Sequence, residues 1–385
     1  MSFKRFISSI ATILALIITA ASCGPRSSSQ KAGEAGADGG ESRFSPRYAA
    51  GFVVRDIPGG CLVDISDPQG EQSQSFRYLL YEGETPPDSI PQGYLPIHIP
   101  VESIVCMTSL QLSNFLCIGE TSRIVGITST KYLFSPVMRE RLESGLTRKI
   151  GIEGNFDSEV ILALNPGIIL ISPFKRGGYE ALKGVDIPLI PHLGYKETTP
   201  LGQAEWIKFA GLLSGCPDEA CRIFEEIEGR YNELKAKVAD VETRPVVLSG
   251  ELHGGNWYVG GGRSFLAQIF RDAGGDYFLP DDNNSGGLNL DFESVYSKTA
   301  EAGYWRIVNS YDGEFSYEAL RAEDARYADL GAFKNRGVIY CNMRLKPFYE
   351  LMPVQPDVVL ADLIHIFHPG VLPQDYTPVF YELLK

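Results

Sequence analysis

Two aromatic residues set between glycine clusters have the clearest binding chemistry in this 385-residue chain. Trp257 and Tyr258 lie between glycines at 254–255 and at 260–262. Glycine lets another group approach the backbone closely, and ligand pockets are mostly apolar with a few polar anchors. Broad aromatic faces in such a setting suit a large planar or macrocyclic ligand. We therefore expect Trp257 and Tyr258 to contact a ligand; ordinary core or surface packing is the alternative.

One further aromatic residue and two arginines extend this ligand-binding hypothesis. Tyr132 follows a short apolar run at 124–128, where a loop is expected. Arg263 and Arg344 could each bind a propionate, a phosphate or another anionic group through two parallel hydrogen bonds. For all three residues, core or surface packing is the alternative interpretation.

The motifs of hydrolases and nucleotide-binding enzymes are missing from the sequence. No Gly-x-Ser-x-Gly segment occurs, so the strand-turn-helix nucleophile of esterases is not supported. The run at 260–264 resembles a phosphate loop only superficially, because it lacks the Gly-Lys-Ser/Thr ending. Carboxylates are plentiful, but no pair of them has a catalytic context. We therefore assign no catalytic residue and expect a protein that is not an enzyme.

The histidines give little support to a metal site. His365 and His368 are three residues apart and could share one metal ion on a helix. Both lie among apolar residues just before a Pro-Gly pair, which favours a packing or capping role. We assign no metal ligand, and a free metal-ion receptor remains an alternative.

The first 42 residues indicate export and anchoring rather than a folded part. Lys4 and Arg5 precede an apolar run at 7–21, which is shorter than the roughly 20 residues of a membrane span. The sequence Ala20-Ala21-Ser22-Cys23 resembles the lipobox of bacterial lipoproteins. The interpretation is a signal peptide at 1–22, a lipidated Cys23 and a flexible tether at 23–42, which is rich in Gly, Ser and Ala.

Export to an oxidising compartment permits disulfides. Cys216 and Cys221 flank a Pro-Asp turn into a helix, and we expect them to form a disulfide. The four other cysteines of the body lie among apolar neighbours and are expected to be buried thiols; they are Cys61, Cys106, Cys117 and Cys341. No Cys-x-x-Cys zinc spacing occurs.

Hydrophobic patterning predicts an α/β protein of two Rossmann-like lobes joined by one long helix. Residues 43–100 form a small N-terminal β extension of short alternating runs and turns. Strands alternate with helices over 101–200 and again over 244–385, which predicts two mostly parallel sheets. Apolar residues at helical spacing over 201–243 predict the connecting helix, interrupted at Cys216-Pro217. The net charge is −13 without a basic stripe, which disfavours nucleic-acid binding.

Four segments, in order along the chain, resemble the helix-linked (class III) periplasmic binding proteins of ABC importers. Gly167 departs from the usual Asp of the second segment. The segments are 103–128, 159–170 with its Leu-Asn-Pro-Gly-Ile-Ile-Leu stretch, 255–275 with its Asn-Trp-Tyr-Val-Gly-Gly stretch, and 291–295 with Asp-Phe-Glu-Ser-Val. The resemblance covers residues 102 to about 308, and the β extension is not part of the family core.

The resemblance implies a ligand in a cleft between the lobes, faced by the loops of Tyr132 and of Trp257 and Tyr258. The implied cargo is a metal chelate, namely a ferric siderophore, haem or cobalamin, and the protein has no cofactor of its own. Tyrosines and arginines among the cleft candidates favour iron complexes. The implied partner is an ABC permease. The protein is expected to be a periplasmic, monomeric lipoprotein that touches the membrane only through its lipid.

The resemblance also implies one exposed glutamate on each lobe that pairs with permease arginines. Glu159 and Glu293 each open a helix at corresponding places of the two lobes. The alternative is that each glutamate serves only its own helix, because a negative charge is favourable at the start of a helix.

Two other functions stay open at this point. A chelatase-like enzyme acting on tetrapyrroles also uses two α/β lobes, and it would need an ionisable pair in the cleft, such as His192 with a carboxylate. A structural surface lipoprotein would bind no ligand.

Overall fold

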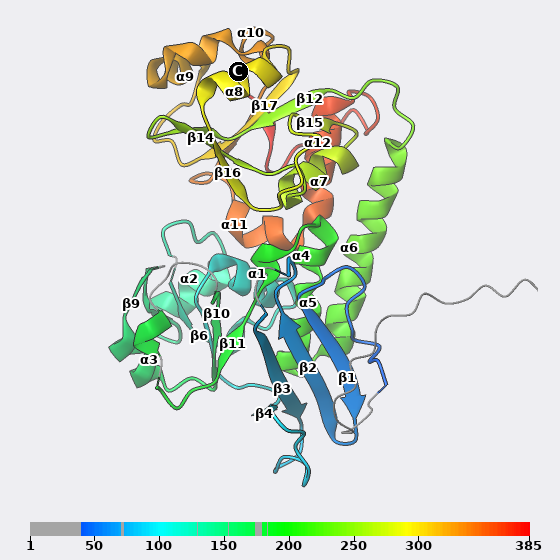
Figure 1. The fold of residues 1–385 in the computed structure, drawn as a ribbon. Helices are drawn as coiled ribbons and strands as arrows, with labels where there is room; N and C mark the ends of the chain where they lie inside the picture. The colour runs from blue at the N-terminus through cyan, green and yellow to red at the C-terminus, as the bar shows by residue number, and fades with distance from the viewer. Residues whose placement is uncertain (1–39, 71–72, 129, 153, 174–178, 183) are drawn as a thin grey trace, which may run out of the picture. The chain divides into compact units, whose positions relative to one another are not determined.

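The computed structural model describes residues 40–70, 73–128, 130–152, 154–173, 179–182 and 184–385. The predicted signal peptide, Cys23 and nearly all of the predicted tether lie outside these residues, so lipidation stays a prediction. Residues 39–385 form a single unit by their internal contacts, and Figure 1 shows its arrangement.

The N-terminal extension is a four-stranded sheet in the order β1-β2-β3-β4. The turn between β1 and β2 needs Gly59, whose φ of +82° suits the third position of a type II turn after Pro58. One face of the sheet is buried through residues such as Val54 and Val63, which pack with Trp206 in one core. The strands are β1 (Phe52–Ile57), β2 (Gly60–Ser66), β3 (Ser75–Tyr81) and β4 (Leu95–His98).

The N-lobe contains a parallel sheet in the order β11-β10-β5-β6-β7. Every residue of β10 is buried, as expected for a strand covered on both faces. Ile168 and Leu170 pack in the core that includes α1 and α5, whereas Ile169 and Ile171 pack in the core that includes α3. The elements are β5 (Ile104–Cys106), α1 (Ser109–Cys117), β6 (Ile124–Ile127), α2 (Pro136–Glu143), β7 (Arg148–Lys149), the hairpin β8 (Gly151–Ile152) and β9 (Asn155–Phe156), α3 (Ser158–Leu164), β10 (Ile168–Ile171) and β11 (Leu189–Pro191).

Three helices connect the lobes: α4 (Pro200–Ala204), α5 (Trp206–Ser214) and α6 (Pro217–Lys237). Gly215 ends α5 with a left-handed φ of +73°, and Pro217 begins α6 without losing a needed donor. The 21 residues of α6 span about 31 Å. In Figure 1 this helix runs from the elements of the N-lobe to those of the C-lobe.

The expected disulfide is wrong for this structure, in which both cysteines are free. Cys216 is the N-cap residue of α6, and Cys221 lies one turn further inside the helix. The expected turn is a continuous helix, which separates these positions along and around its axis beyond the Cα distance that a disulfide tolerates. Cys61, Cys106 and Cys341 are buried, as expected, and Cys117 is half-buried.

The C-lobe contains a sheet in the order β15-β12-β17-β18-β19, parallel except for β19, and a three-stranded antiparallel sheet β13-β14-β16. Trp257, Trp305 and Tyr327 pack together at its centre, with ring centroids 4.9–5.7 Å apart. The strands are β12 (Val246–Ser249), β13 (Glu251–His253), β14 (Asn256–Gly260), β15 (Asp276–Tyr277), β16 (Gly287–Leu290), β17 (Tyr304–Asn309), β18 (Val338–Asn342) and β19 (Glu382–Leu383). The helices are α7 (Phe265–Asp272), α8 (Phe292–Thr299), α9 (Tyr317–Glu323), α10 (Gly331–Lys334), α11 (Phe348–Leu351) and α12 (Pro356–Phe367).

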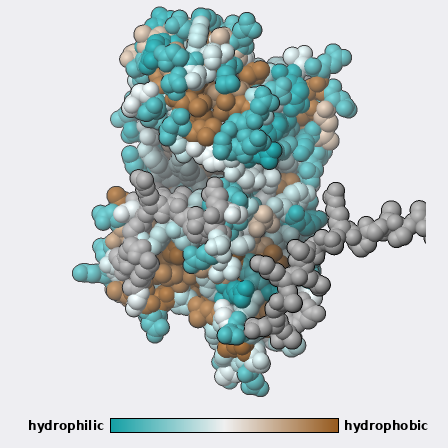
Figure 2. Space-filling model, in the orientation of Figure 1, coloured by the Kyte–Doolittle hydropathy of each residue, from teal (hydrophilic) through white to brown (hydrophobic). Residues whose placement is uncertain are grey.

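The predicted fold class is therefore confirmed: two α/β lobes with mostly parallel sheets, a helical connection and a small β extension. Among the residues that the structure describes, none of the helices combines the length and the apolar character that a membrane span requires. On the face shown in Figure 2, apolar residues form separate patches between hydrophilic ones.

Candidate functional site

A cavity of about 560 Å³ lies at the carboxyl ends of the parallel strands of the N-lobe. Thr108 follows β5, Thr128 follows β6, and Lys149 ends β7. Ligands of open α/β sheets bind at this edge. The wall, here called the N-lobe cavity, is completed by residues near α4 and α11; it consists of Thr108, Ser109, Leu110, Thr128, Thr130, Lys131, Tyr132, Lys149, Ile152, Tyr195, Gln203, Tyr349, Met352 and Pro353.

The N-lobe cavity has a cationic, hydroxyl-rich wall. Lys131 and Lys149 supply two ammonium groups, and the described lining residues include no Asp or Glu. Ser109 and Leu110 open α1, so the positive end of that helix also faces the cavity. Thr108 caps the helix by accepting a hydrogen bond from the Gln111 backbone. The wall therefore favours a ligand that presents anionic oxygens.

Tyr132 stands where the two lobes meet. The nearby Ser310 side chain, followed by that of Lys131, lowers the pKa of Tyr132. The Lys131 Nζ atom lies 5.0 Å from the centre of the Tyr132 ring. Arg344 adds a smaller electrostatic effect in the same direction, and its guanidinium lies 3.3 Å from the Asp312 carboxylate. Tyr132 lines the N-lobe cavity, whereas Arg344 is not among its lining residues, and the binding roles of both residues remain predictions.

Glu350 holds the same loop of the N-lobe from the other side. The backbone N–H of Ser135 donates to its Oε2 atom at 2.9 Å, and the N–H of Phe134 donates to Oε1. Glu350 is buried, which raises the pKa of its carboxyl group, and the two backbone donors oppose that shift. The loop after β6 is therefore bound at Glu350, and Ser310 lies near its Tyr132.

A second cavity of about 560 Å³ follows the parallel strands of the C-lobe. Glu251 comes after β12, and Asn309 and Ser310 come at the end of β17. Burial raises the pKa of Glu251 to about 7, against the effect of a hydrogen bond from Asn309 at 3.2 Å. The wall of this C-lobe cavity consists of Glu251, Leu252, His253, Gly254, Gly255, Asn309, Ser310, Tyr311, Glu323, Asp324, Arg326 and Tyr327.

The expectation that Trp257 stacks on a ligand is wrong. Its side chain is 0 % exposed, and its Nε1 atom donates to the Ser249 carbonyl at 2.9 Å. The burial of β14 alternates, so Trp257 and Val259 point into the core and Tyr258 points outward. The glycines at 254–255 form the turn between β13 and β14 and also line the C-lobe cavity.

The two other predicted ligand contacts lie apart from both cavities. Tyr258 is 56 % exposed and lines neither the N-lobe nor the C-lobe cavity. Arg263 lines a third cavity of about 460 Å³, together with Arg271 and acidic residues at 281–282. Neither residue is brought near Tyr132 by an observed contact, and their roles in binding remain predictions.

Several lining residues were missed by sequence reasoning. Lys131 had a signal, because it neighbours Tyr132 in the same loop after a strand. No local signal in the sequence marked the other missed residues, because only the fold brings positions so far apart to one wall; they are Lys149, Tyr195, Gln203 and Tyr349.

Glu159 and Glu293 occupy matching positions in the two lobes. Glu159 is in the first turn of α3 and Glu293 in the first turn of α8, each after an aspartate cap, Asp157 or Asp291. Both glutamates are exposed. The docking role stays a prediction that this geometry permits.

His192 and His368 make packing and hydrogen-bonding contacts inside the protein, whereas His253 lines the C-lobe cavity. His192 is buried against Trp206, with ring centroids 4.4 Å apart, and burial lowers its pKa to about 3. Its Nε2 atom contacts the Asn114 amide at 3.2 Å rather than a carboxylate. His368 contacts the Gly274 carbonyl at 3.1 Å, which fits the expected capping role. Within the described part of the chain, no three His, Cys, Asp or Glu residues are grouped as metal ligands.

Comparisons with known proteins agree with this architecture. Residues 104–345, more than half of the chain, match the periplasmic binding protein family. An uncharacterised lipoprotein of Methanocaldococcus jannaschii is 24% identical over 318 residues, covering 80% of each chain. A periplasmic haem-binding protein of Pseudomonas aeruginosa has a TM-score of 0.56 at 18% identity, covering 72% of this chain and 96% of its own. A periplasmic vitamin B12-binding protein of Vibrio cholerae has a TM-score of 0.51 at 15% identity, and the match covers 70% of this chain and 97% of that protein.

The solved structures share the fold, and the family match covers both lobes and their connection. The chain therefore belongs to the periplasmic binding protein family and has the helix-linked architecture of its class III members.

Proposed function

We propose that this protein captures an iron complex, either a ferric siderophore or haem, or a cobalamin, and delivers it to the permease of an ABC importer. The protein makes and breaks no bond of its cargo. Membership of a family of substrate-binding proteins supports the role in transport. The likeness to haem-binding and vitamin B12-binding proteins supports the class of cargo.

The observation that carries the proposal is the wall of the N-lobe cavity. Lys131, Lys149 and the start of α1 favour anionic oxygens, such as propionates or catecholates. Tyr132, Tyr195 and Tyr349 offer ring faces and hydroxyl groups to a large flat ligand. Among the proposed cargoes, this chemistry favours an iron complex over cobalamin.

The proposed site of action is outside the cytoplasm, with the protein held at the membrane by a lipid on Cys23. The name of the Methanocaldococcus jannaschii relative, a lipoprotein, supports this anchor. Changing Cys23 to Ser would leave the protein in the soluble fraction of cell lysates; unchanged membrane association would contradict the anchor.

The proposed permease contacts are Glu159 and Glu293, one on each lobe. Exposed charges of this kind act mainly on association and orientation, and salt weakens them. The Glu159→Arg/Glu293→Arg double variant should keep its ligand affinity and lose uptake in cells. Normal uptake at equal protein level would contradict these contacts.

A chelatase-like function has lost its main support. The example of such a pair that the sequence offered, His192 with a carboxylate, is not formed, because His192 is buried beside Trp206 and Asn114. The transport role therefore has the stronger structural basis.

Thermal unfolding with a panel of ligands tests the proposal. The panel consists of haemin, a ferric catecholate siderophore and cyanocobalamin. A ligand at a hundredfold excess over its Kd stabilises the folded state by about 2.7 kcal/mol. At least one member should raise the Tm of the protein, and the Lys149→Gln variant should reduce that shift.

Lys298→Gln serves as the matched control, because Lys298 is exposed on α8 away from the cavity walls. This variant should keep the full Tm shift. The absence of a shift with all three ligands would contradict the proposed cargo class.

A further inference from the structure

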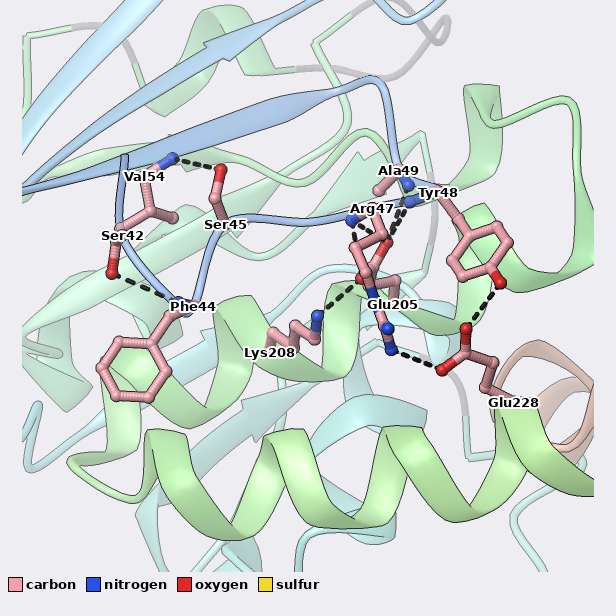
Figure 3. A network of polar contacts seen from close by, with 10 residues as sticks. All are labelled: Ser42, Phe44, Ser45, Arg47, Tyr48, Ala49, Val54, Glu205, Lys208 and Glu228. Carbon is pink, nitrogen blue, oxygen red and sulfur yellow. Dashed lines mark hydrogen bonds and ion pairs between the residues drawn. The ribbon is translucent and has the colours of Figure 1, made fainter. Parts of the chain in front are cut away.

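Five consecutive backbone N–H groups of the N-terminal extension bind two buried carboxylates of the helical connection. The N–H groups of residues 47–49 donate to Glu205 at 2.6–3.0 Å. Those of Ala50 and Gly51 donate to Glu197 at 2.9–3.1 Å. Figure 3 shows the first of these groups, with Glu205 beneath the chain.

Both carboxylates are held on their other sides by this part of the N-lobe. The Lys208 Nζ atom lies 2.7 Å from Glu205, which is 0 % exposed. The Trp206 Nε1 atom donates to Glu197 at 3.0 Å. Burial raises the pKa of Glu197, and its donors oppose that shift. A buried charge is tolerated only when it is paired. Loss of the extension's N–H donors would therefore leave both carboxylates with too few partners and destabilise their buried positions.

The two carboxylates flank the wall of the N-lobe cavity. Tyr195 lies two residues before Glu197, and Gln203 lies two residues before Glu205. Both Tyr195 and Gln203 line the cavity. The Gln203 Nε2 atom donates to the Gly194 carbonyl at 3.1 Å, so the wall segment 194–205 is also closed on itself.

The extension holds this wall segment at a further point. The Lys196 Nζ atom forms a buried ion pair with Asp67 at 2.7 Å. The Gln69 side chain donates to the Lys196 carbonyl at 2.8 Å. Asp67 and Gln69 follow β2, so two separate parts of the extension bind the same wall segment.

The same extension residues are bound to the helix that connects the lobes. The Tyr48 hydroxyl donates to the Glu228 carboxylate of α6 at 2.5 Å, and Arg47 forms an ion pair with it. Figure 3 shows both contacts next to the bonds to Glu205. Residues 47–51 therefore contact both α6 and the segment at 194–205.

We propose that the N-terminal extension positions the ligand cavity: residues 47–51 fix segment 194–205 against α6 and thereby set the placement of Tyr195 and Gln203. Glu197 and Glu205 are positioning residues, which act on the ligand through these two side chains. The consequence for affinity rests on the proposed function, whereas the fixing of the wall segment does not.

The first test uses hydrogen exchange of the full chain without a ligand. A Cβ atom on Gly51 would lie 2.6 Å from Trp206 Cζ2 and 3.0 Å from Glu197 Oε1. Gly51→Ala should therefore speed exchange in peptides covering 194–205 at least tenfold, with strands β5 and β10 unchanged. Gly40→Ala is the matched control, because a Cβ atom there would meet no heavy atom within 4 Å.

A second pair of variants distinguishes a local effect on segment 194–205 from a general loss of structure. Glu205→Gln retains one acceptor oxygen and Glu205→Ala retains none, so exchange in 194–205 should rise in that order. Unchanged exchange in this segment, or an equal rise throughout the N-lobe, would overturn the positioning role.

The second test measures affinity for haemin, the ferric catecholate siderophore and cyanocobalamin. For a probe that binds the unaltered protein, Gly51→Ala should raise the Kd at least fivefold, and Gly40→Ala should not change it. An unchanged Kd despite faster exchange would overturn the effect on the cavity. If no probe binds the unaltered protein, the proposed cargo class fails, and hydrogen exchange alone decides whether the extension fixes the wall.

Discussion

The N-lobe cavity and the C-lobe cavity occupy equivalent edges of two parallel sheets, yet their walls differ in charge. Among the described lining residues, the first has two lysines and no carboxylate. The second has Glu251, Glu323 and Asp324 against Arg326. The shared fold thus places a hollow at each carboxyl edge, whereas the residues that follow the strands set its chemistry. A ligand with an anionic side is expected to turn that side toward the N-lobe.

Reversing the charge of the N-lobe wall should have the largest effect. The Lys131→Glu/Lys149→Glu double variant would place two carboxylates where the ligand's anionic oxygens are expected. We expect the affinity for haemin or the ferric catecholate siderophore to fall on the order of 100-fold, about 2.7 kcal/mol. Isothermal titration would measure this change.

The matched control for the charge reversal is Lys298→Glu, at an exposed position of α8. Its affinity should equal that of the unaltered protein. If the affinity of the double variant is within twofold of that of the unaltered protein, the N-lobe wall is not part of the ligand site.

The C-lobe wall should also differ from the N-lobe wall in its effect on the pH dependence of stability, because Glu251 holds a proton near neutral pH. Burial raises its pKa from 4.5 to about 7, so the folded protein holds this proton more tightly than the unfolded chain. Its contribution to the free energy of unfolding is therefore largest below pH 4.5 and is lost as the pH rises through 7. We expect a loss on the order of 2 kcal/mol from this group.

Urea unfolding of Glu251→Gln at pH 5 and pH 8 checks this contribution. The variant should lose less stability between the two pH values than the unaltered protein. Equal losses would show that Glu251 titrates normally. Glu197, Glu350 and Asp362 also have raised pKa values and cancel in this comparison. Glu323 also has a raised pKa and raises that of Glu251, so its titration is part of the measured difference.

The smallest effect is expected at the contact between the lobes. Tyr132→Phe removes the hydroxyl that lies near Ser310 and Lys131 and leaves the ring in the cavity wall. A neutral hydrogen bond contributes about 1 kcal/mol, so ligand affinity should fall about fivefold. Tyr296→Phe, at an exposed residue of α8 outside both cavities, should leave the affinity unchanged, and an equal fall in both variants would contradict a specific role for Tyr132.

Local patterns were enough to predict most of the elements. The alternation of strands and helices predicted the two lobes, and Cys216-Pro217 predicted the break between α5 and α6. The second α/β unit could be predicted because some of its helices, such as α7, have apolar residues at helical spacing. Strand β4, which pairs in parallel with β3, was missed because its four residues include a proline.

The site was harder to predict, because its residues meet only through the fold. The type of Trp257 suggested a ligand contact, but a strand alternates its side chains, and the phase of that alternation depends on where the core lies. The bonds from residues 47–51 to Glu197 and Glu205 join positions about 150 apart. Nothing in the local sequence of either partner indicates the other.

Anomalous diffraction from crystals grown with haemin, the ferric catecholate siderophore or cyanocobalamin tests the central claim most directly. Iron or cobalt in the bound ligand gives a peak that locates the cargo without assumptions about its pose. We predict one strong peak beside the N-lobe cavity, within reach of Tyr132 and Lys149. A peak confined to the third cavity near Arg263, or no peak with any of the three ligands, would contradict the claim.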